Sequence, residues 1–344
     1  MVFKKGSLEI SRYWDVADFS QPLDGLSDTE YAARFKELLE DSVRLRLRSD
    51  VPLGVNLSGG LDSPGLVVTV NKLLGGAGDL QTFSMCYDEK KYDERGMIEK
   101  LVPLLKCQSN FSCLKADEVF DIANSVLWHQ EQPFGGIPTI AYWKLNQLAH
   151  DKGVTVLLEG QGVDEMLAGY KYFYGAFFLD LLASLKIGRL FRELKEYQKF
   201  NRLSFARLLK FLAAVFKAYY GYGSQDASRF LKLNCLAPDF KSKFHHKLRW
   251  RKPSGSRLAN MMYRDIRYTK LPRVLRFNDR MSMAFSRELR VPYLDHRIAE
   301  LAFSIPASQK IRGGLNKVVL RNALEDLLPD ELRLRPKLAV ASPQ

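Results

Sequence analysis

The hydrophobic pattern in the first half of the chain alternates between two periods. Short apolar runs at Gly54–Leu57, Gln81–Cys86 and Val154–Leu158 have the length of buried strands. Between them, Arg95–Lys106 and Pro138–Asp151 repeat apolar residues at helical spacing. Short apolar strands separated by helices predict a parallel sheet with helices on both faces, so we expect an α/β fold.

Helical patterns flank this region on both sides. Ser27–Glu30 has the sequence of a capping box, and apolar residues recur at helical spacing from there to Val43. After Tyr170 the strand patterns mostly disappear, and Leu179–Lys217 and Leu258–Leu328 have helical patterns. We therefore predict a connector at residues 1–26 and a domain at residues 27–344, which divides into an α/β nucleotide core (27–170), a basic helical insertion (171–256) and a helical C-terminal part (257–344).

Charge is concentrated in the helical insertion. The chain has 344 residues, of which 46% are apolar and 26% charged, a composition typical of globular proteins. The net charge is +13. Residues Lys186–Lys252 include 17 basic and 4 acidic residues, so this segment alone accounts for the net positive charge of the chain. Such a block predicts an anionic partner, which could be nucleic acid, a membrane surface or a substrate, although a solvated helical face would have the same composition.

The N-terminus and the cysteines bear on location. Met1–Gly6 lacks the apolar segment of a secretory signal, and no run approaches the ~18 apolar residues of a membrane span. The four cysteines form no C-x-x-C pair and have no metal-site spacing with histidine. We therefore expect a cytoplasmic protein with reduced thiols, not a zinc site or a disulfide framework. The cysteines are Cys86, Cys107, Cys113 and Cys235.

The segment Leu57–Ser63 has the composition of an anion-binding loop. It follows a predicted strand and precedes an apolar helix, so its two glycines allow a tight turn that brings N–H groups to an anion at the helix N-terminus. Pro64 fits the start of that helix, where its missing N–H costs nothing. An acid in this loop would repel the anion, so Asp62 predicts a bridging Mg²⁺. The alternative is an ordinary glycine-rich turn capped by Asp62.

A second acidic loop, Glu159–Glu165, follows the strand predicted at Val154–Leu158. Ligands of parallel sheets bind beyond the carboxyl ends of the strands, so Asp164 is expected to share a crevice with Asp62. Two carboxylates suit a Mg²⁺ ion that is held mainly by phosphates, water and one or two side chains. The alternative role of Asp164 is the N-cap of a helix.

Five segments together resemble a known family. S-G-G-L-D-S at Ser58–Ser63 looks like the pyrophosphate loop of the ATP-pyrophosphatase (PP-loop) superfamily. Leu158–Tyr170 is similar to the S-G-E-G-A-D-E-L-F-x-G-Y signature of asparagine synthetases. Arg276–Ala284, Arg290–Arg297 and Lys310–Arg321 resemble the family's R-x-x-D-R-x-S-M-A, R-V-P-F-L-D-H-R and K-x-x-L-R stretches. The chain is therefore similar to the synthetase domain of the glutamine-hydrolysing asparagine synthetases.

The resemblance implies an ATP-dependent, amide-forming ligase. Such enzymes use ATP and Mg²⁺ to adenylate a small-molecule carboxylate with release of pyrophosphate, and ammonia then displaces AMP. Aspartate, which gives asparagine, is the working acceptor. Lys317 would approach the α-phosphate of ATP and stabilise charge in the reaction, and Asp62 and Asp164 would bind Mg²⁺. The smaller match at Tyr92–Glu94 is expected to order the site.

The remaining roles implied by the resemblance concern the nucleotide and the acceptor. Ser58, Gly59, Gly60, Leu61, Asp62 and Ser63 would bind the pyrophosphate part of ATP, and Leu57, Met85, Glu159 and Gly160 would surround adenosine. Two positions depart from the family signature. Glu159 replaces a serine, and Gln161 replaces the glutamate associated with forming the adenylate intermediate. Because glutamine loses the negative charge, a sugar acid in envelope polysaccharide synthesis is an alternative acceptor.

The ends of the chain and its basic block raise further alternatives. Glutamine-using members carry a glutaminase domain that begins with cysteine, whereas Val2 follows Met1 here, so a glutaminase domain outside this chain or another source would supply ammonia. Arg335–Leu338 resembles the start of a longer family tail. A tRNA-modifying PP-loop enzyme would suit the basic block, but the sequence has no aromatic-rich nucleic-acid module, and nucleic acid is not the expected partner. A further alternative is a family member that binds its ligands but has lost catalysis, and Gln161 is the only residue that favours it.

Overall fold

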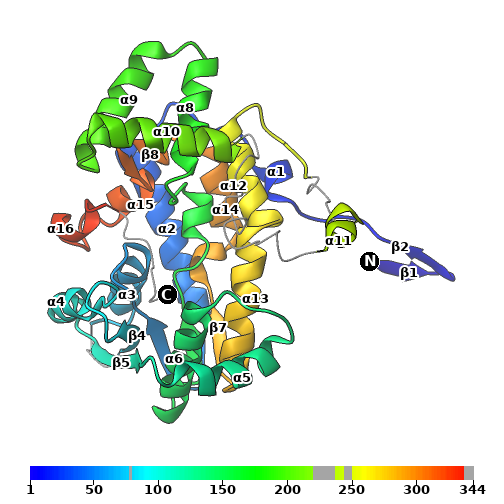
Figure 1. Ribbon diagram of the computed structural model, residues 1–344, viewed down its shortest axis with the longest axis vertical. Coiled ribbons are helices and arrows are strands. Elements are labelled where there is room, and N and C mark those ends of the chain that lie inside the picture. Colours follow the sequence, from blue (N-terminus) through cyan, green and yellow to red (C-terminus); the bar gives the residue numbers. More distant parts are fainter. Residues whose placement is uncertain (77–79, 220–236, 244–249, 337–344) are drawn as a thin grey trace.

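The centre of the molecule is a five-stranded sheet in which all neighbouring strands are parallel (Figure 1). The computed structural model describes residues 1–76, 80–219, 237–243 and 250–336. The strands are β3 (Leu53–Asn56), β4 (Gln81–Tyr87), β5 (Gln108–Leu114), β6 (Val156–Leu158) and β7 (Glu288–Arg290), in the order β5-β4-β3-β6-β7. The predicted α/β fold is confirmed, and β3, β4 and β6 lie at the predicted apolar runs.

The hydrophobic pattern did not reveal β5 and β7. β5 is an edge strand in which most side chains are at least partly exposed, so it has no continuous apolar run. β7 has only three residues and lies within a stretch of helical pattern. Both strands pair through contacts that are distant in sequence, which local periodicity does not report.

The strand order brings two distant segments side by side. The chain runs from β3 outward through β4 to β5 and then returns to β6 on the other side of β3. In the β3–β6 pair, Val55 lies opposite Leu158. The carboxyl ends of these two strands therefore meet at a topological switch point, where open parallel sheets bind their ligands.

Alternating residues of the strands divide the core into two layers. Val156 and Leu158 pack in one cluster, and Leu157 between them packs in the other. The first layer contains α2 (Asp28–Arg46), α3 (Asp62–Leu73), α4 (Arg95–Leu105), α14 (His296–Ser304) and α15 (Val318–Ala323). The second contains α5 (Val119–Gln130), α6 (Ile137–Asp151) and α13 (Lys270–Met283).

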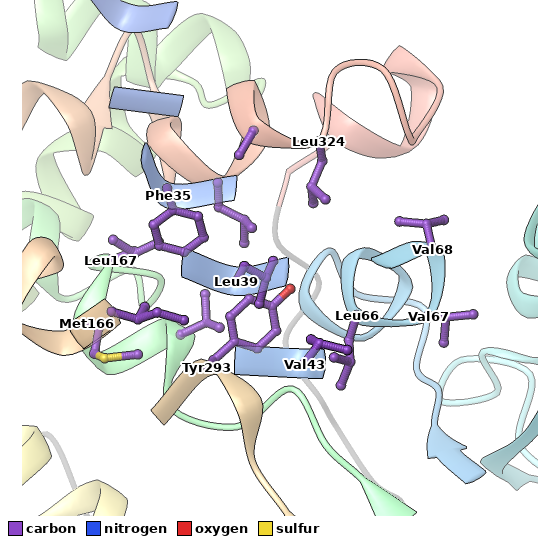
Figure 2. Packing of buried hydrophobic residues seen from close by; sticks show 14 of the residues in the cluster. Phe35, Leu39, Val43, Leu66, Val67, Val68, Met166, Leu167, Tyr293 and Leu324 are labelled. Atoms are coloured by element: carbon purple, nitrogen blue, oxygen red, sulfur yellow. The ribbon is translucent and has the colours of Figure 1, made fainter. Parts of the chain in front are cut away.

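Helix α2 begins at the predicted capping box. The Glu30 N–H donates to the Ser27 side chain, and the Ser27 N–H donates to the Glu30 carboxylate. Its apolar face carries Phe35, Leu39 and Val43, which are buried in the first cluster (Figure 2). Full burial of such side chains contributes about 1.5–3 kcal/mol each, so this face anchors α2 to the rest of the core.

The second half forms a helical lobe with its own core, built from α8 (Phe173–Ala183), α9 (Ile187–Phe200), α10 (Phe205–Tyr219) and α12 (Arg257–Arg267).

The remaining elements are β1 (Val2–Lys4), β2 (Ser7–Glu9), α1 (Val16–Phe19), α7 (Val163–Met166), α11 (Pro238–Lys243), η2 (Pro292–Leu294), η3 (Ala307–Gln309), β8 (Ile311–Arg312), β9 (Leu315–Asn316) and α16 (Asp330–Arg333). Residues 220–236 and 244–249 of the basic block lie outside the described residues. Among the described helices, none combines the length and apolar content of a membrane span.

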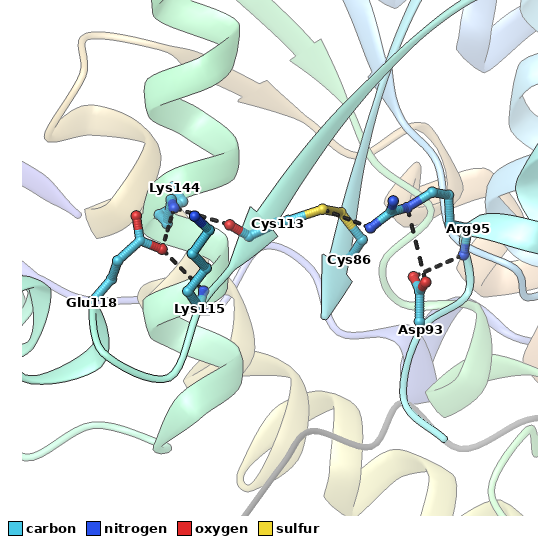
Figure 3. The surroundings of a disulfide bond; sticks show 7 residues. All are labelled: Cys86, Asp93, Arg95, Cys113, Lys115, Glu118 and Lys144. Atoms are coloured by element: carbon cyan, nitrogen blue, oxygen red, sulfur yellow. Dashed lines mark hydrogen bonds and ion pairs between the residues drawn. A yellow bond between two sulfur atoms is a disulfide. The ribbon is translucent and has the colours of Figure 1, made fainter. Parts of the chain in front are cut away.

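One expectation about the cysteines is wrong. Cys86 and Cys113 form a disulfide between the adjacent strands β4 and β5, with their Cα atoms 4.4 Å apart (Figure 3). The register of the parallel pair sets these two residues opposite each other, and spacing along the sequence cannot show this. Cys107 is a free thiol, and Cys235 lies outside the described residues.

Candidate active site

The glycine-rich loop joins β3 to α3 and is closed by its own serines. The Ser58 N–H donates to the Ser63 hydroxyl oxygen at 2.8 Å, and the two hydroxyl oxygens lie 2.9 Å apart. Helix α3 begins at Asp62 with Leu61 as its N-cap, so Pro64 lies in the first turn, where N–H groups have no partner within the helix. Asp62 is therefore not the N-cap, and its carboxylate is directed to another partner.

Two charged side chains contact this loop from outside it. The Gly59 N–H donates to the Glu94 carboxylate at 2.8 Å, so Glu94 orders the loop. The Arg335 guanidinium donates to the Gly60 carbonyl at 3.2 Å and to Met97 Sδ at 3.1 Å. Burial lowers the pKa of Arg335, and the nearby Glu94 charge opposes that shift. Sequence reasoning gave Arg335 no role in the site, because only the fold brings this late segment to the loop.

The second acidic loop runs from β6 into α7 and touches the first. A side chain at Gly160 would lie 3.2 Å from the Cβ of Asp62, so glycine allows the two loops to approach each other. Gly162, with φ +94°, is the N-cap of α7, and a side chain there would overlap Leu294. Asp164 is therefore not the N-cap, and its carboxylate pairs with Lys317.

Lys317 joins the two loops. Its ammonium nitrogen lies 2.7 Å from both carboxylate oxygens of Asp62 and 2.6 Å from Oδ1 of Asp164. The lysine side chain is 4% exposed, and each aspartate side chain is 18% exposed. Burial would lower the pKa of Lys317, but the charges of Asp164 and Asp62 outweigh it and raise the pKa. The structure thus brings three predicted residues from distant segments into one charged cluster.

The backbone at Lys317 is strained and held in place. Lys317 has φ +56° and ψ +39°, a left-handed conformation that non-glycine residues seldom adopt. The preceding Asn316 side chain donates to the Gly169 carbonyl at 2.5 Å, and Arg321 donates to the Asn316 carbonyl at 2.6 Å. A side chain at Gly169 would overlap both Asp164 and Lys317. Strain of this kind persists where surrounding contacts fix the geometry, as they do at functional sites.

Aromatic and charged side chains from residues 165–172 and from α13 lie next to the cluster. The Tyr170 hydroxyl donates to Glu165 at 2.8 Å, and the Lys270 ammonium lies 3.4 Å from the centre of the Tyr170 ring. Burial raises the pKa of Glu165 to about 7, and the charge of Asp164 adds to the shift. Tyr172 stacks on Tyr170 at 5.4 Å between ring centres. Glu165 lies in the second acidic loop but was given no role of its own, and no sequence motif connects Lys270 with this loop.

The residues expected around adenosine lie at the same edge in different environments. Leu57 is buried in the first core cluster, and Met85 is half-buried on β4. The Glu159 carboxylate is buried and accepts hydrogen bonds from Asn56 at 2.6 Å, from Asn278 at 3.0 Å and from the Tyr142 hydroxyl. Its side chain therefore connects β3, α6 and α13.

The comparison with known proteins identifies the family. The sequence model of asparagine synthase matches residues 34–344. The chain belongs to the asparagine synthase family. Glutamine-hydrolysing asparagine synthetases 1 and 3 of Bacillus subtilis are both 27% identical to it, over 90% and 98% of this chain and 49% and 52% of their own lengths. The amidase chyE of Penicillium rubens is 24% identical over 96% of this chain and 55% of its own. The chain spans about half the length of these relatives.

The two departures from the asparagine synthase signature have different structural contexts. The hydrogen bonds of Glu159 give its larger, charged side chain a place inside the protein, which accounts for a glutamate at a position where serine is expected. Gln161 lies half-buried in the turn between β6 and α7, three residues before Asp164. Nothing in the local geometry explains why this position has lost a charge.

Two cavities lie away from this cluster. They have volumes of about 840 and 530 Å³ and lie between α9 and the turn that joins β8 to β9. Lys199 and Phe200 line the first, and Arg189 and Arg192 line the second. The paired carboxylates and the strained backbone lie at Lys317 and not at these cavities.

Proposed function

We propose that this chain is the carboxylate-activating domain of a glutamine-dependent amidotransferase. A carboxylate oxygen of the acceptor attacks the α-phosphorus of ATP, the bond to pyrophosphate breaks, and an acyl-adenylate forms. Ammonia then attacks the acyl carbon, AMP leaves and a proton is released, which gives an amide. The observation that carries this proposal is the convergence of Lys317, Asp62 and Asp164 at the carboxyl ends of β3 and β6.

The donor set fits a magnesium ion. Asp62 and Asp164 belong to different loops, yet their oxygens lie within 2.7 Å of one cationic nitrogen, so the two carboxylates are already arranged around a positive charge. Hard carboxylate oxygens are the side-chain ligands that Mg²⁺ prefers. These two residues would hold the ion, which when bound neutralises charge on the phosphates of ATP.

Lys317 supplies a second positive charge from the protein itself. Its ammonium group is buried, so its interaction with charge that develops on the α-phosphate would be weakly screened. The fixed backbone places this group without further ordering during the reaction. The phosphate loop, with Ser58 and Ser63 beside the start of α3, would bind the departing pyrophosphate.

Aspartate, which gives asparagine, is the acceptor we assign first. The names of the Bacillus subtilis relatives favour this choice. A second candidate is a non-aspartate acid such as a sugar acid, and Gln161 favours it because the neutral amide changes the charge near the acceptor. One relative of this chain is named an amidase and not an asparagine synthetase, which leaves room for another acceptor. Ammonia would come from a glutaminase domain or another source.

The test is ATP–pyrophosphate exchange with Mg²⁺, measured for aspartate and for uronic acids. Exchange reports adenylation directly and needs no ammonia. We expect one acid to support exchange that Lys317→Ala slows about a hundredfold, and the exposed Lys195→Ala on α9 to behave as wild type. If no acid supports exchange in the folded protein, or if Lys317→Ala retains full exchange, the proposed function is wrong.

A further inference from the structure

Large apolar side chains are exposed at one end of the helical lobe. Helices α9 and α10 pack on α8 at the end of the molecule away from the β4–β5 edge of the sheet (Figure 1). We call residues 182–214 the helical tip. Its exposed apolar side chains, with their exposed fractions, are Leu182 (46%), Leu185 (82%), Ile187 (40%), Phe191 (68%), Phe205 (66%) and Leu209 (50%). Isolated exposed apolar residues are common on proteins, but six within so short a segment are not.

Four of these residues lie on the solvent-facing sides of α9 and α10. Ile187 and Phe191 are four residues apart and share a stripe of α9 with Lys195. The opposite side of α9 holds the buried Glu193 and Tyr197. On α10, Phe205 and Leu209 are also four residues apart and both exposed. Each helix therefore presents an apolar stripe that the described residues of the lobe leave exposed.

The exposed charges of the helical tip all have one sign. Its exposed basic residues are Lys186, Arg192, Lys195, Lys199, Arg202, Arg207 and Lys210. The segment contains two acidic residues, and neither is exposed. Glu193 is buried and accepts the Gly313 N–H at 2.8 Å, and Glu196 is half-buried. Apolar stripes beside a surface with seven exposed basic residues and no fully exposed acidic residue have the composition of helices that lie in a membrane interface.

Leu185 adds an independent sign that this surface has a role. It lies in the turn after α8 with φ +54°, where glycine is the favoured residue because a side chain is strained. The Lys186 N–H bonds to the Leu181 carbonyl at 2.9 Å and fixes this turn. The chain thus retains a strained leucine whose side chain is 82% exposed. Stability within the chain does not account for it, since glycine would fit better.

We propose that the helical tip binds anionic phospholipid membranes, with the apolar stripes inserted among the acyl chains and the basic residues at the headgroups. A second copy of the same surface is not the partner, because two positively charged tips would repel each other. Protein interfaces are depleted in lysine at their centres, and binding to the phosphates of a nucleic acid would use the basic side chains but leave the apolar stripes exposed. A bilayer with negative headgroups satisfies both the apolar and the basic side chains.

The test is sedimentation of the full chain with vesicles of two compositions. We expect binding to vesicles made of equal parts phosphatidylglycerol and phosphatidylcholine and no binding to phosphatidylcholine alone. Added salt should weaken the binding, because charges at the surface are screened. Leu185→Gly combined with Phe191→Ser should reduce the bound fraction by about tenfold or more, since two apolar side chains no longer enter the bilayer.

Two controls separate membrane binding from a folding defect. Leu185→Gly alone should keep or raise the melting temperature, because it relieves the strained backbone, while it still lowers binding. Phe120→Ser removes a side chain that is 84% exposed on α5, far from the tip, and should bind like the wild type. The idea is overturned if wild-type protein ignores anionic vesicles, if the tip variants bind unchanged, or if the tip instead mediates dimerisation or tRNA binding. Adenylation is measured separately, so either proposal can fail alone.

Discussion

Two regions of this molecule use basic side chains in opposite ways. At the switch point of the sheet, the single ammonium of Lys317 is 4% exposed at its side chain and is paired with two carboxylates at 2.6 and 2.7 Å. On the helical tip, seven basic side chains are exposed without an exposed acidic residue in the segment. The first region concentrates charge in the interior, and the second distributes it over a surface.

The difference teaches what each region can do. Inside the protein an ionic interaction is strong and weakly screened, so a buried lysine can stabilise charge that develops in a reaction. At the surface the interaction is screened within about 8 Å at physiological ionic strength, so basic side chains act collectively and reversibly. Substitutions in the first region should therefore change turnover, and those in the second should change salt-sensitive binding.

The largest effect is expected at Asp62. Asp62→Asn keeps the size of the side chain but removes one of the two charges around Lys317, so the proposed Mg²⁺ site is lost. We expect ATP–pyrophosphate exchange to fall by about a thousandfold or more, with unchanged circular dichroism. The matched control is Asp326→Asn, because that side chain is 82% exposed and pairs only at the surface with Lys36. Exchange near the wild-type rate in Asp62→Asn would refute the metal role.

A smaller but still large effect is expected at Lys317. Lys317→Ala should slow turnover about a hundredfold, or ~3 kcal/mol, and change the Michaelis constant for ATP little, because the lysine acts on the transition state. Lys317→Arg should restore little activity, since a planar guanidinium cannot take the place of a point charge. If alanine instead raised the Michaelis constant and left turnover intact, Lys317 would be a ground-state ligand of ATP.

Arg335 lies between the two extremes, since it is half-buried and contacts the phosphate loop at Gly60. A hydrogen bond to a charged group contributes about 1.5–3 kcal/mol, so Arg335→Ala should raise the Michaelis constant for pyrophosphate about tenfold in the exchange assay. Glu94→Gln should lower it, because the loop loses a negative charge while Gly59 keeps an acceptor. Arg44→Ala, on a side chain that is 61% exposed, is the control. An unchanged constant in Arg335→Ala would limit this residue to a structural role.

The sequence was most informative where structure is local. The capping box of α2 and the strands β3, β4 and β6 depend on neighbouring residues, and each was predicted from them. The proximity of Asp62 and Asp164 was also predicted, because each residue lies in a short loop after a strand and parallel sheets bind ligands beyond the carboxyl ends of their strands.

Features that depend on long-range register were not predictable. The Cys86–Cys113 disulfide requires the register of β4 and β5, and β5 itself was missed because an edge strand has no continuous apolar run. Lys270 reaches the Tyr170 ring from another helix, and no motif connects the two. The left-handed backbone at Lys317 was also not predicted, because lysine gives no local signal for it.

The smallest effect is expected at Gln161, which tests the acceptor. Aspartate carries an α-ammonium group that a sugar acid lacks, and a glutamate at this position would attract it. Gln161→Glu should therefore raise aspartate-dependent exchange by about fivefold, which corresponds to ~1 kcal/mol for one solvated charge pair, and leave exchange with a uronic acid unchanged or weaker. Gln108→Glu makes the same charge change at the exposed amino end of β5, the end of the sheet opposite the two loops, and should leave both rates unaltered. Lysine substitutions on α9 should also leave both rates unaltered, since the helical tip takes no part in adenylation of a soluble acid. Strong aspartate-dependent exchange by the unmodified chain would remove the case for a different acceptor, and Gln161 would then be a harmless replacement in an asparagine-forming site.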